Sequence, residues 1–191
     1  MPDGSHQKGH PPVANFDELL DKYEKPIYNV IFRMTGDRDE AADLTQETFV
    51  AAYKSFQAFK GESNIFTWLC QIAVNKCKNK FKERDRKRRF EFLLRDLKFG
   101  SDETVENESA SGIEERTPLS ELERKELQTK ITEAISKLPD EYRTVIVLRD
   151  LQGLSYQEIA QIVGISLDAV KIRIYRGRSI LRQKLGPYLE G

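Results

Sequence analysis

Apolar residues recur every three or four positions along most of this chain, a spacing that places them on one side of an α-helix. No segment alternates apolar and polar residues for long enough to predict a β-strand. We therefore expect an all-α protein whose helices each bury one face. The segments that carry this pattern are 16–34, 37–56, 65–84, 119–138, 142–148, 156–163 and 166–185.

Two local signals refine the first helices. Pro26 interrupts the first segment and predicts either a kink or the start of a new helix. Asp37, followed three residues later by Glu40, resembles a capping box that begins the second helix.

The helical pattern disappears between residues 95 and 118, where Gly, Ser, Glu, Asp and Asn dominate. A polar, acidic segment of this kind cannot bury enough apolar surface to fold alone, so it predicts a flexible linker. The sequence thus indicates two small helical domains and four parts in all. These parts are a disordered leader (1–14), a first domain (15–94), a flexible acidic linker (95–118) and a second domain (119–191).

Charge is distributed unevenly although the formal net charge is zero. Residues 76–89 include nine basic and two acidic side chains, and residues 167–184 include six basic and one acidic. Residues 99–116 have six acids against one arginine. Two basic stretches separated by an acidic one predict two places that meet a polyanion.

The cysteines and histidines do not predict a disulfide or a metal site. Cys70 and Cys77 are seven residues apart on one predicted helix, about 10 Å by helical rise, which is too far for a disulfide. A site shared with His6 and His10 lacks the C-x-x-C spacing of zinc ligands. We expect reduced thiols, no metal and no cofactor.

Catalysis and membrane insertion are not expected either. Asp17, Glu18 and Asp21 are acids in a first helical turn, where they complement the helix dipole. The chain has no Gly-rich phosphate loop and no His-containing triad, so we do not expect an enzyme. No apolar run is long enough to span a bilayer, and residues 1–12 lack the apolar core of a signal peptide, which predicts a cytoplasmic protein.

The C-terminal part predicts a helix-turn-helix. Ser155 and Glu158 form a capping box for a short helix, Gly164 supplies a tight turn, and Ser166 caps a second helix that we expect Gly186-Pro187 to end. Ala160 and Gly164 are small residues for a close helix crossing, and Val170 with Ile174 anchor the second helix. Its outward side offers side chains that suit phosphates and guanine edges in a major groove: Lys171, Arg173, Tyr175, Arg176 and Arg178.

The third predicted helix combines aromatic, amide and basic side chains, a mixture that suits single-stranded bases. Phe66 and Leu69 are expected in the core, whereas Trp68 is equally consistent with core or surface. The polar loop at 59–65 is a candidate pocket for a flipped base.

Three long motifs resemble those of extracytoplasmic-function sigma factors, over about residues 16–89 and 120–185. The N-terminal motifs are Asp43-Leu44-Thr45-Gln46-Glu47-Thr48-Phe49 and Phe59-Lys60-Gly61-Glu62-Ser63-Asn64-Ile65-Phe66-Thr67-Trp68-Leu69, followed by Ile72-Ala73-Val74-Asn75. The C-terminal motifs are Leu138-Pro139-Asp140-Glu141-Tyr142-Arg143, Gly153-Leu154-Ser155-Tyr156-Gln157-Glu158-Ile159-Ala160 and Val170-Lys171-Ile172-Arg173-Ile174-Tyr175-Arg176-Gly177-Arg178.

The resemblance implies that the first domain is a sigma region-two domain, which binds the clamp helices of the polymerase β′ subunit and melts the −10 element. The basic run after it would grip the DNA backbone. The implied polymerase-binding residues are Asp43, Gln46, Glu47, Phe49, Val50 and Tyr53. The implied −10 residues are Phe59, Lys60, Gly61, Glu62, Ser63, Asn64, Ile65, Asn75, Lys76, Lys78, Asn79 and Lys80.

The resemblance also implies that the second domain is a region-four domain, which reads the −35 element and contacts the β flap. Leu167-Asp168-Ala169 and Ile172 depart from the commoner pattern of the family, which affects the −35 preference. An anti-sigma partner is implied by the family alone. The implied −35 residues are Ser155, Tyr156, Ser166, Lys171, Arg173, Tyr175, Arg176 and Arg178.

The alternative reading is a stand-alone helix-turn-helix regulator with an N-terminal sensor. It predicts a ligand pocket or a phospho-acceptor in the first domain, and the sequence of that domain shows no such group of residues. A runoff transcription assay with core polymerase separates a sigma factor, which initiates, from a regulator or an enzyme, which do not.

Overall fold

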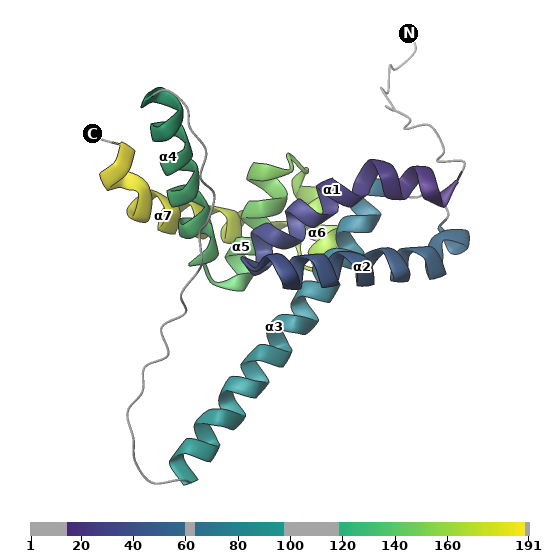
Figure 1. The fold of residues 1–191 in the computed structure, drawn as a ribbon, viewed down its shortest axis with the longest axis horizontal. Coiled ribbons are helices and arrows are strands. Elements are labelled where there is room, and N and C mark those ends of the chain that lie inside the picture. Colours follow the sequence, from purple (N-terminus) through teal and green to yellow (C-terminus); the bar gives the residue numbers. More distant parts are fainter. Residues whose placement is uncertain (1–14, 60–63, 98–118, 190–191) are drawn as a thin grey trace.

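The computed structural model describes residues 15–59, 64–97 and 119–189. No strand occurs among them, which confirms the all-α expectation, and none of their helices is long and apolar enough to cross a membrane. The helices are α1 (Phe16–Thr35), α2 (Arg38–Ser55), α3 (Ile65–Leu97), α4 (Leu119–Ser136), α5 (Asp140–Ile146), α6 (Tyr156–Val163) and α7 (Leu167–Leu189), with a 3-10 turn η1 (Phe56–Ala58) and a π turn η2 (Val147–Leu151) (Figure 1).

Helices α1 and α2 begin and end at the residues that the local chemistry favours. Gly36 has φ of 76° after α1, and its N–H donates to the Phe32 carbonyl oxygen at 2.8 Å. The Asp37 carboxylate accepts a hydrogen bond from the Glu40 N–H at 2.8 Å, which caps α2. Pro26 lies inside a continuous α1, because buried residues before and after it hold the helix against its neighbours.

Helix α3 is longer than the sequence predicted. It was expected to end near Arg84, but it continues to Leu97 and includes the first three residues of the predicted linker. Its outer half projects from the helical body (Figure 1). Arg, Lys and Glu favour helix, and ion pairs one turn apart support it, so this part needs no burial to stay helical. These pairs are Lys80–Glu83 (3.7 Å), Arg88–Asp85 (3.4 Å) and Lys87–Glu91 (3.9 Å).

Helix α7 crosses α5 closely at Gly177. A Cβ atom built on Gly177 would lie 2.8 Å from Cγ1 of Ile146, so only glycine fits there without a shift. The close crossing expected at Gly164 is wrong, since a Cβ there would meet no atom within 4 Å. The expected end of α7 at Gly186-Pro187 is also wrong: Pro187 removes a single backbone donor two residues before the helix ends at Leu189.

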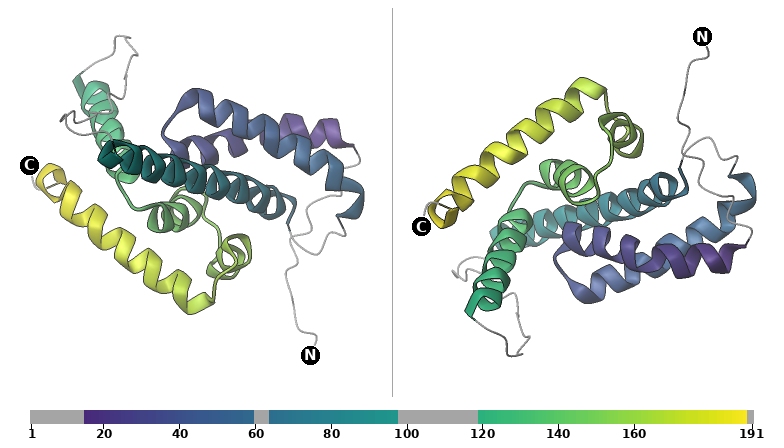
Figure 2. Two further views of the ribbon diagram at one scale, coloured as in Figure 1. Left: turned by 90° about the horizontal axis from the view of Figure 1, so that it is seen from below. Right: turned by 90° about the horizontal axis from the view of Figure 1, so that it is seen from above.

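The N-terminal and C-terminal helices pack against each other in this structure. Helix α3 lies between the α1–α2 pair and the α5–α6 pair, with α7 beyond them (Figure 2). One continuous hydrophobic core contains residues from both parts of the chain. The predicted linker at 98–118 and the leader at 1–14, with His6 and His10, lie outside the described residues.

Hydrogen bonds between described residues join the two parts. On one side Arg33 donates to the Thr132 hydroxyl at 2.7 Å, and Arg143 donates to a backbone carbonyl of α1 at 2.8 Å. On the other side Thr67 donates to the Glu158 carboxylate at 3.0 Å, and Lys78 donates to the last carbonyl of α6 at 2.6 Å. This contact is not predictable from local sequence, because its donors and acceptors are far apart in the chain.

Candidate nucleic-acid and protein-binding surfaces

The helix-turn-helix predicted from the sequence is present in α6 and α7. The Ser155 hydroxyl accepts from the Glu158 N–H at 3.2 Å, and the Glu158 carboxylate accepts from the Ser155 N–H at 2.8 Å, which completes the capping box. Gly164 has φ of 72° in the turn. Val170 and Ile174 are buried, so they fix the rotation of α7 about its axis. The turn between α6 and α7 therefore has the expected geometry of a DNA-binding module.

Most of the predicted cations on α7 are paired with acids of the same part of the chain. Lys171 pairs with Asp168 at 3.0 Å on its own helix. Arg173 is half-buried and contacts Glu141 of α5 at 3.1 Å. These contacts leave fewer free cations on α7 than its sequence indicates.

The other two predicted arginines of α7, Arg178 and Arg176, differ in whether they are paired with an acid. The Arg178 Nε donates to Asp150 Oδ2 at 3.1 Å, and this hydrogen bond raises the pKa of Arg178 above its ordinary value. Arg176 is exposed and has no partner among the described residues. Tyr175 beside it is 76% exposed. Arg176 and Tyr175 are therefore the predicted −35 side chains of α7 that are most available to a ligand.

The other predicted −35 residues have local roles in the fold. Ser155 caps α6, and the Ser166 hydroxyl accepts from the Ala169 N–H at 3.2 Å at the start of α7. Tyr156 is half-buried, with the Arg149 guanidinium 4.9 Å from the centre of its ring.

The start of α3 presents one aromatic pair beside the predicted −10 loop. The ring centroids of Phe59 and Trp68 lie 4.8 Å apart, and both residues are half-buried. The exposed Asn64 accepts from the Phe66 N–H at 2.9 Å and so caps the helix. Ile65, another predicted −10 residue, is 7% exposed and packs in the core. Lys60, Gly61, Glu62 and Ser63 lie outside the described residues.

Further along α3, the predicted −10 residues separate into free and engaged side chains. Asn75 and Asn79 are exposed and have no partner among the described residues. Lys76 pairs with Glu47 of α2 at 2.9 Å, and Lys80 pairs with Glu83.

Lys78 is engaged in the contact between the two parts of the chain. Its ammonium caps the C-terminus of α6 through the Val163 carbonyl. Burial, followed by the nearby charges of Arg173 and Lys82, lowers the pKa of Lys78.

Thr67 and Glu158 form a polar contact that was not predicted from the sequence. Thr67 is 2% exposed on α3, and its hydroxyl donates to the Glu158 carboxylate at 3.0 Å. Burial opposes ionisation of Glu158, but hydrogen bonds from the Ser155 hydroxyl, the Ser155 N–H and Thr67 outweigh it and lower the pKa of Glu158. A threonine within an apolar motif was the one sequence signal that a buried polar contact exists there, although the partner of that threonine could not be predicted.

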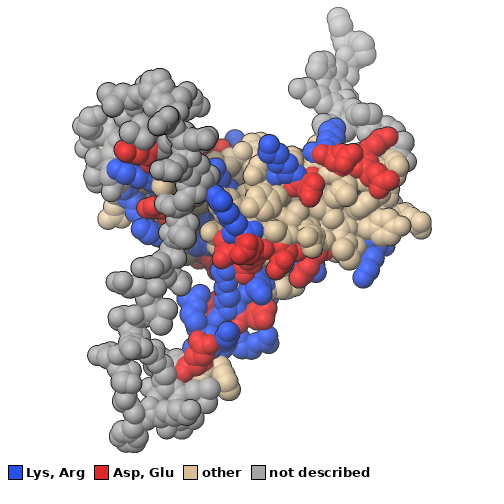
Figure 3. All heavy atoms as spheres, in the orientation of Figure 1, with Lys and Arg blue, Asp and Glu red and all other residues tan. Residues whose placement is uncertain are grey.

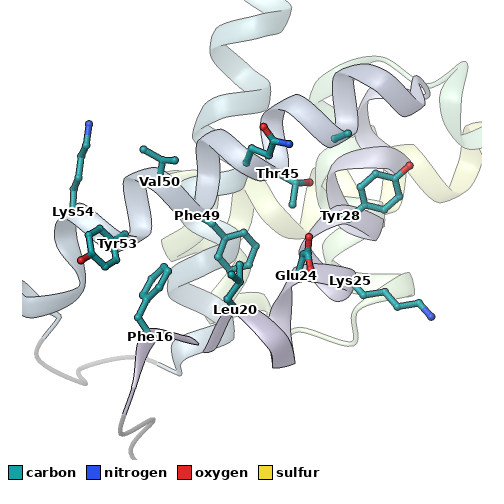
Figure 4. A pocket seen from close by; sticks show the side chains of 12 residues that line it. Phe16, Leu20, Glu24, Lys25, Tyr28, Thr45, Phe49, Val50, Tyr53 and Lys54 are labelled. Atoms are coloured by element: carbon teal, nitrogen blue, oxygen red, sulfur yellow. The ribbon is translucent and has the colours of Figure 1, made fainter. Parts of the chain in front are cut away.

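A groove of about 770 Å³ lies between α1 and α2 (Figure 4). Val50 and Tyr53 of α2 are 55% and 67% exposed at its edge, and Phe16 of α1 packs edge-on against Tyr53 at 5.1 Å. The aromatic and aliphatic lining makes the groove mainly apolar, with charged side chains at its margin. The lining residues are Phe16, Leu20, Tyr28, Ala42, Thr45, Gln46, Phe49, Val50 and Tyr53, with Glu24, Lys25 and Lys54.

The predicted polymerase-binding residues lie on or beside this groove, with one correction. Asp43, Gln46 and Glu47 are exposed on α2, as a binding surface requires. Phe49 is 6% exposed, so it supports the groove from within the core and does not present a free surface. The contribution of α1 to the groove was not predicted, because the apolar residues of α1 all fit a single core-facing pattern.

The buried thiols are not reactive groups. Cys70 and Cys77 are both fully buried and free. Burial raises the pKa of each to about 12, which keeps the thiols protonated. The part of the chain that the structure describes contains no cluster of His, Cys, Asp and Glu that could hold a metal ion.

A helix-turn-helix is typical of DNA-binding transcription proteins, and two family models match the sequence of this chain. Sigma-70 region 2 matches residues 19–87, and Sigma-70, region 4 matches residues 128–181. The chain is 34% identical to the ECF RNA polymerase sigma-E factor of Haemophilus influenzae over 91% of this chain and 89% of that one. It is 36% identical to the ECF RNA polymerase sigma factor SigW of Bacillus subtilis over 89% and 88% of the two chains.

Solved structures show the same fold. The sigma factor RpoE of Bartonella quintana, in complex with the anti-sigma factor NepR, has a TM-score of 0.63 at 24% identity and covers 91% of this chain and 98% of its own. CnrH, in complex with the cytosolic domain of CnrY, has a TM-score of 0.60 at 22% identity and covers 91% of both chains.

The chain therefore belongs to the extracytoplasmic-function sigma factors of the sigma-70 family. It is a transcription initiation factor and not an enzyme, as the sequence motifs implied. This excludes the stand-alone regulator, which shares only the helix-turn-helix.

Proposed function

We propose that this sigma factor reads the −10 element with α3 and the −35 element with α7, and that it binds core RNA polymerase through α2. The observation that carries the proposal is that both DNA-binding helices keep exposed polar side chains with no partner among the described residues. These side chains are Asn75 and Asn79 on α3 and Arg176 on α7.

At the −10 element, Asn75 is the residue that reads an unpaired base. An amide offers both donors and an acceptor, which single-stranded bases need once their Watson–Crick edges are exposed. The aromatic pair of Phe59 and Trp68 stands beside the loop that precedes α3, so the predicted pocket for the flipped base has one aromatic wall.

The groove between α1 and α2 supports polymerase binding. It joins an apolar floor to the exposed polar side chains Gln46 and Asp43 of α2, a combination typical of protein interfaces. The clamp helices of the β′ subunit are the proposed occupant, since the family resemblance placed their contacts on this helix.

Simultaneous binding of both promoter elements requires the two parts of the chain to separate. By their numbering the −10 and −35 elements lie about 25 base pairs apart, roughly 85 Å of duplex at 3.4 Å per base pair. In this structure α3 packs directly on α6, with Lys78 donating to the Val163 carbonyl. The open form depends on the linker predicted at 95–118.

An anti-sigma factor is the proposed regulator, and the cytoplasm is the proposed location. Two solved structures with this fold are complexes with a partner, which is named as an anti-sigma factor in one and as the cytosolic domain of CnrY in the other. The proposed contact of the C-terminal part with the β flap follows from the same family membership.

Runoff transcription with core RNA polymerase tests the function as a whole. Sequencing of the transcript 5′ ends identifies the promoters, on which Asn75→Ala is then compared with wild type. We expect Asn75→Ala to lower permanganate reactivity of the −10 strand while affinity for core polymerase is unchanged. Asn29→Ala, an exposed asparagine on α1, is the matched control. Equal reactivity in all three proteins contradicts the role of Asn75.

The polymerase surface is tested by titration with core polymerase. Changing Gln46 to Ala and Glu47 to Lys should weaken assembly, because both side chains are exposed on the proposed surface. Since Glu47 also pairs with Lys76, the single change Lys76→Ala shows how much of the effect comes from losing that ion pair. Unchanged affinity of the Gln46 and Glu47 variant places the polymerase contact elsewhere.

A further inference from the structure

The outward face of α7 has an aliphatic side chain at its centre. Val170, Ile174 and Gly177 are buried, so they mark the inward side of the helix. At 3.6 residues per turn, Ile172 lies about 160° around the helix from both Val170 and Ile174. It therefore points away from the core of the domain, and its side chain is 52% exposed.

The neighbours of Ile172 on this face differ in their chemistry. They lie three, four or seven residues from it and are Asp168, Tyr175, Arg176 and Ser179. Tyr175 is 76% exposed, and Arg176 has no partner among the described residues. Around the helix, Ile172 lies between the ring of Tyr175 and the guanidinium of Arg176.

The paired cations of α7 lie to either side of this face. Lys171 and Arg178 are on one flank and Arg173 is on the other, each about 100° or more from Ile172 around the helix, and each is paired with an acid. On the projecting half of α3, by contrast, charged side chains of both signs gather along the helix (Figure 3). A helix in the major groove turns its centre toward base edges and its flanks toward the phosphates. Ile172 is thus the side chain of α7 that faces the bases most directly.

Thymine alone has an apolar group on its major-groove edge, the C5-methyl group. The other bases present hydrogen-bond donors and acceptors there, and an aliphatic side chain would separate these from water without replacing the hydrogen bond. Against a thymine methyl, the same side chain removes two apolar surfaces from water. A single exposed isoleucine is ordinary on a protein surface, so it is the central position of Ile172 that points to a ligand.

We propose that Ile172 is a specificity-determining residue that contacts the methyl group of a thymine in the −35 element. This inference deepens the proposed function and rests on it, because it requires α7 to read that element. Ile172 and Arg176 are four residues apart, about 6 Å by helical rise. The thymine should therefore lie within about two base pairs of the position that Arg176 contacts.

Replacing thymine by uracil tests the contact, because it removes the methyl group and leaves base pairing intact. Sequencing of transcript 5′ ends first identifies a promoter. Holoenzyme, reconstituted from core RNA polymerase and the full chain, is then bound to promoter fragments in which each thymine of the −35 element is replaced in turn. Competition at one salt concentration gives relative affinities. One uracil position should lower affinity about fourfold, as expected for one buried methyl group.

Ile172→Ala should remove this discrimination, so that the thymine-to-uracil ratio at that position falls from about four to about one. Since Ile172 is exposed and alanine favours helix, circular dichroism should show an intact α7. Leu151→Ala is the matched control, because leucine is an isomer of isoleucine and Leu151 is 41% exposed on η2, outside α7. It should keep the ratio of about four.

Ile172→Ser gives a second, independent readout. A hydroxyl donates and accepts hydrogen bonds, so it can pair with any polar base edge. This variant should bind promoters with any of the four bases at the position of the thymine more evenly than wild type does. Arg176→Ala should relax a different position.

Three results would overturn the proposal. If no uracil lowers the affinity, Ile172 contacts no thymine methyl. If the uracil penalty persists in Ile172→Ala, the methyl group acts through another side chain or through the shape of the DNA. If Ile172→Ala weakens assembly with core polymerase and leaves the uracil penalty unchanged, Ile172 belongs to a protein interface.

Runoff transcription with the same proteins separates the two levels of the argument. If wild type does not initiate with core polymerase, the proposed function fails, and this inference fails with it. If wild type initiates and loses affinity when −35 base pairs are exchanged, but no uracil has an effect, only the further inference fails.

Discussion

Helices α3 and α7 are both long and basic, yet they use their cations differently. On α7, Arg173 and Arg178 bind acids on α5 and η2, so the fold itself uses these charges. On the outer half of α3, Arg86 and Arg89 have no partner among the described residues. Helix α7 is held in place by its neighbours, whereas the outer half of α3 is supported by its own sequence.

This difference shows that a count of basic residues does not measure the charge available to a ligand. The basic stretches at 76–89 and 167–184 gave the same prediction from the sequence, namely contact with a polyanion. In the structure, a cation that is paired with an acid must give up that pair before it can bind a phosphate. Free cations therefore identify the binding face more sharply than composition does.

The largest expected effect concerns Arg143 on α5, the helix that packs against α7. Arg143 is 12% exposed and donates to the Met34 carbonyl on α1, to two carbonyls at the end of α4 and to the Leu138 carbonyl beyond it. Burial lowers the pKa of Arg143. Arg143→Ala should reduce the free energy of unfolding by about 3 kcal/mol, measured with urea, because four carbonyl acceptors, three of them partly buried, lose their donor. Arg86→Ala on α3 should cost under about 0.5 kcal/mol. Similar losses for the two arginines would break the comparison.

The next effect concerns recognition by α7. Arg176→Ala should leave stability within about 0.5 kcal/mol of wild type, since the side chain has no partner among the described residues. If Arg176 contacts guanine in two places, its loss should cost about 1–3 kcal/mol of binding and relax one base position. Binding of the full chain to single-base variants of its −35 element measures this.

Arg178→Ala is the matched control for Arg176→Ala, because its ion pair with Asp150 is lost instead. It should cost up to about 1 kcal/mol of stability and should not alter base preference. Altered preference with Arg178→Ala but not with Arg176→Ala would place the recognition face on the other side of α7. Lys171→Ala provides a second comparison, since lysine does not make the two-pronged contact as well.

A smaller effect is expected at the crossing of α5 and α7. Gly177→Ala should lower stability by about 1–2 kcal/mol, because the added Cβ lies 2.8 Å from a carbon of the buried Ile146. Ser179→Ala introduces alanine two residues further along α7 at an exposed position, and should be neutral or slightly stabilising. Thermal unfolding of both variants separates the steric effect of the added atom at the crossing from the effect of alanine on helix propensity. A Gly177 variant as stable as wild type would show that the Ile146 side chain can shift without a loss of stability.

The smallest effect concerns Glu158, which links the helix-turn-helix to α3. The pKa of Glu158 is lowered in the folded chain. At pH values above the ordinary glutamate pKa, the ionised carboxylate therefore stabilises the fold. This stabilisation is lost as the pH falls through the lowered pKa. The difference in unfolding free energy between wild type and Glu158→Gln should therefore be constant near pH 7 and shrink below about pH 4.3. Thr67→Val should reduce this pH dependence in part, because the Ser155 bonds remain. If the difference in unfolding free energy grows on acidification, the pKa of Glu158 is not lowered in the folded chain.

The sequence by itself determined the local elements and the family. Ser155, Glu158 and Gly164 define α6 through contacts within a few residues, and α6 has the predicted bounds. The anchors Val170 and Ile174 are buried as their spacing indicated. Capping, glycine turns and helical periodicity act over one or two turns, so their outcome can be predicted from neighbouring residues.

Only the tertiary structure decided which side chains are engaged in contacts within the fold. Thr67 meets Glu158 across 91 residues of sequence, and Arg178 meets Asp150 across 28. The close crossing at Gly177 depends in the same way on where α5 lies. Such contacts follow from how whole helices pack, and the sequence near either partner carries no signal for the other. The sequence thus determined that two helices are basic and amide-bearing, and packing decided which of their side chains remain free to bind.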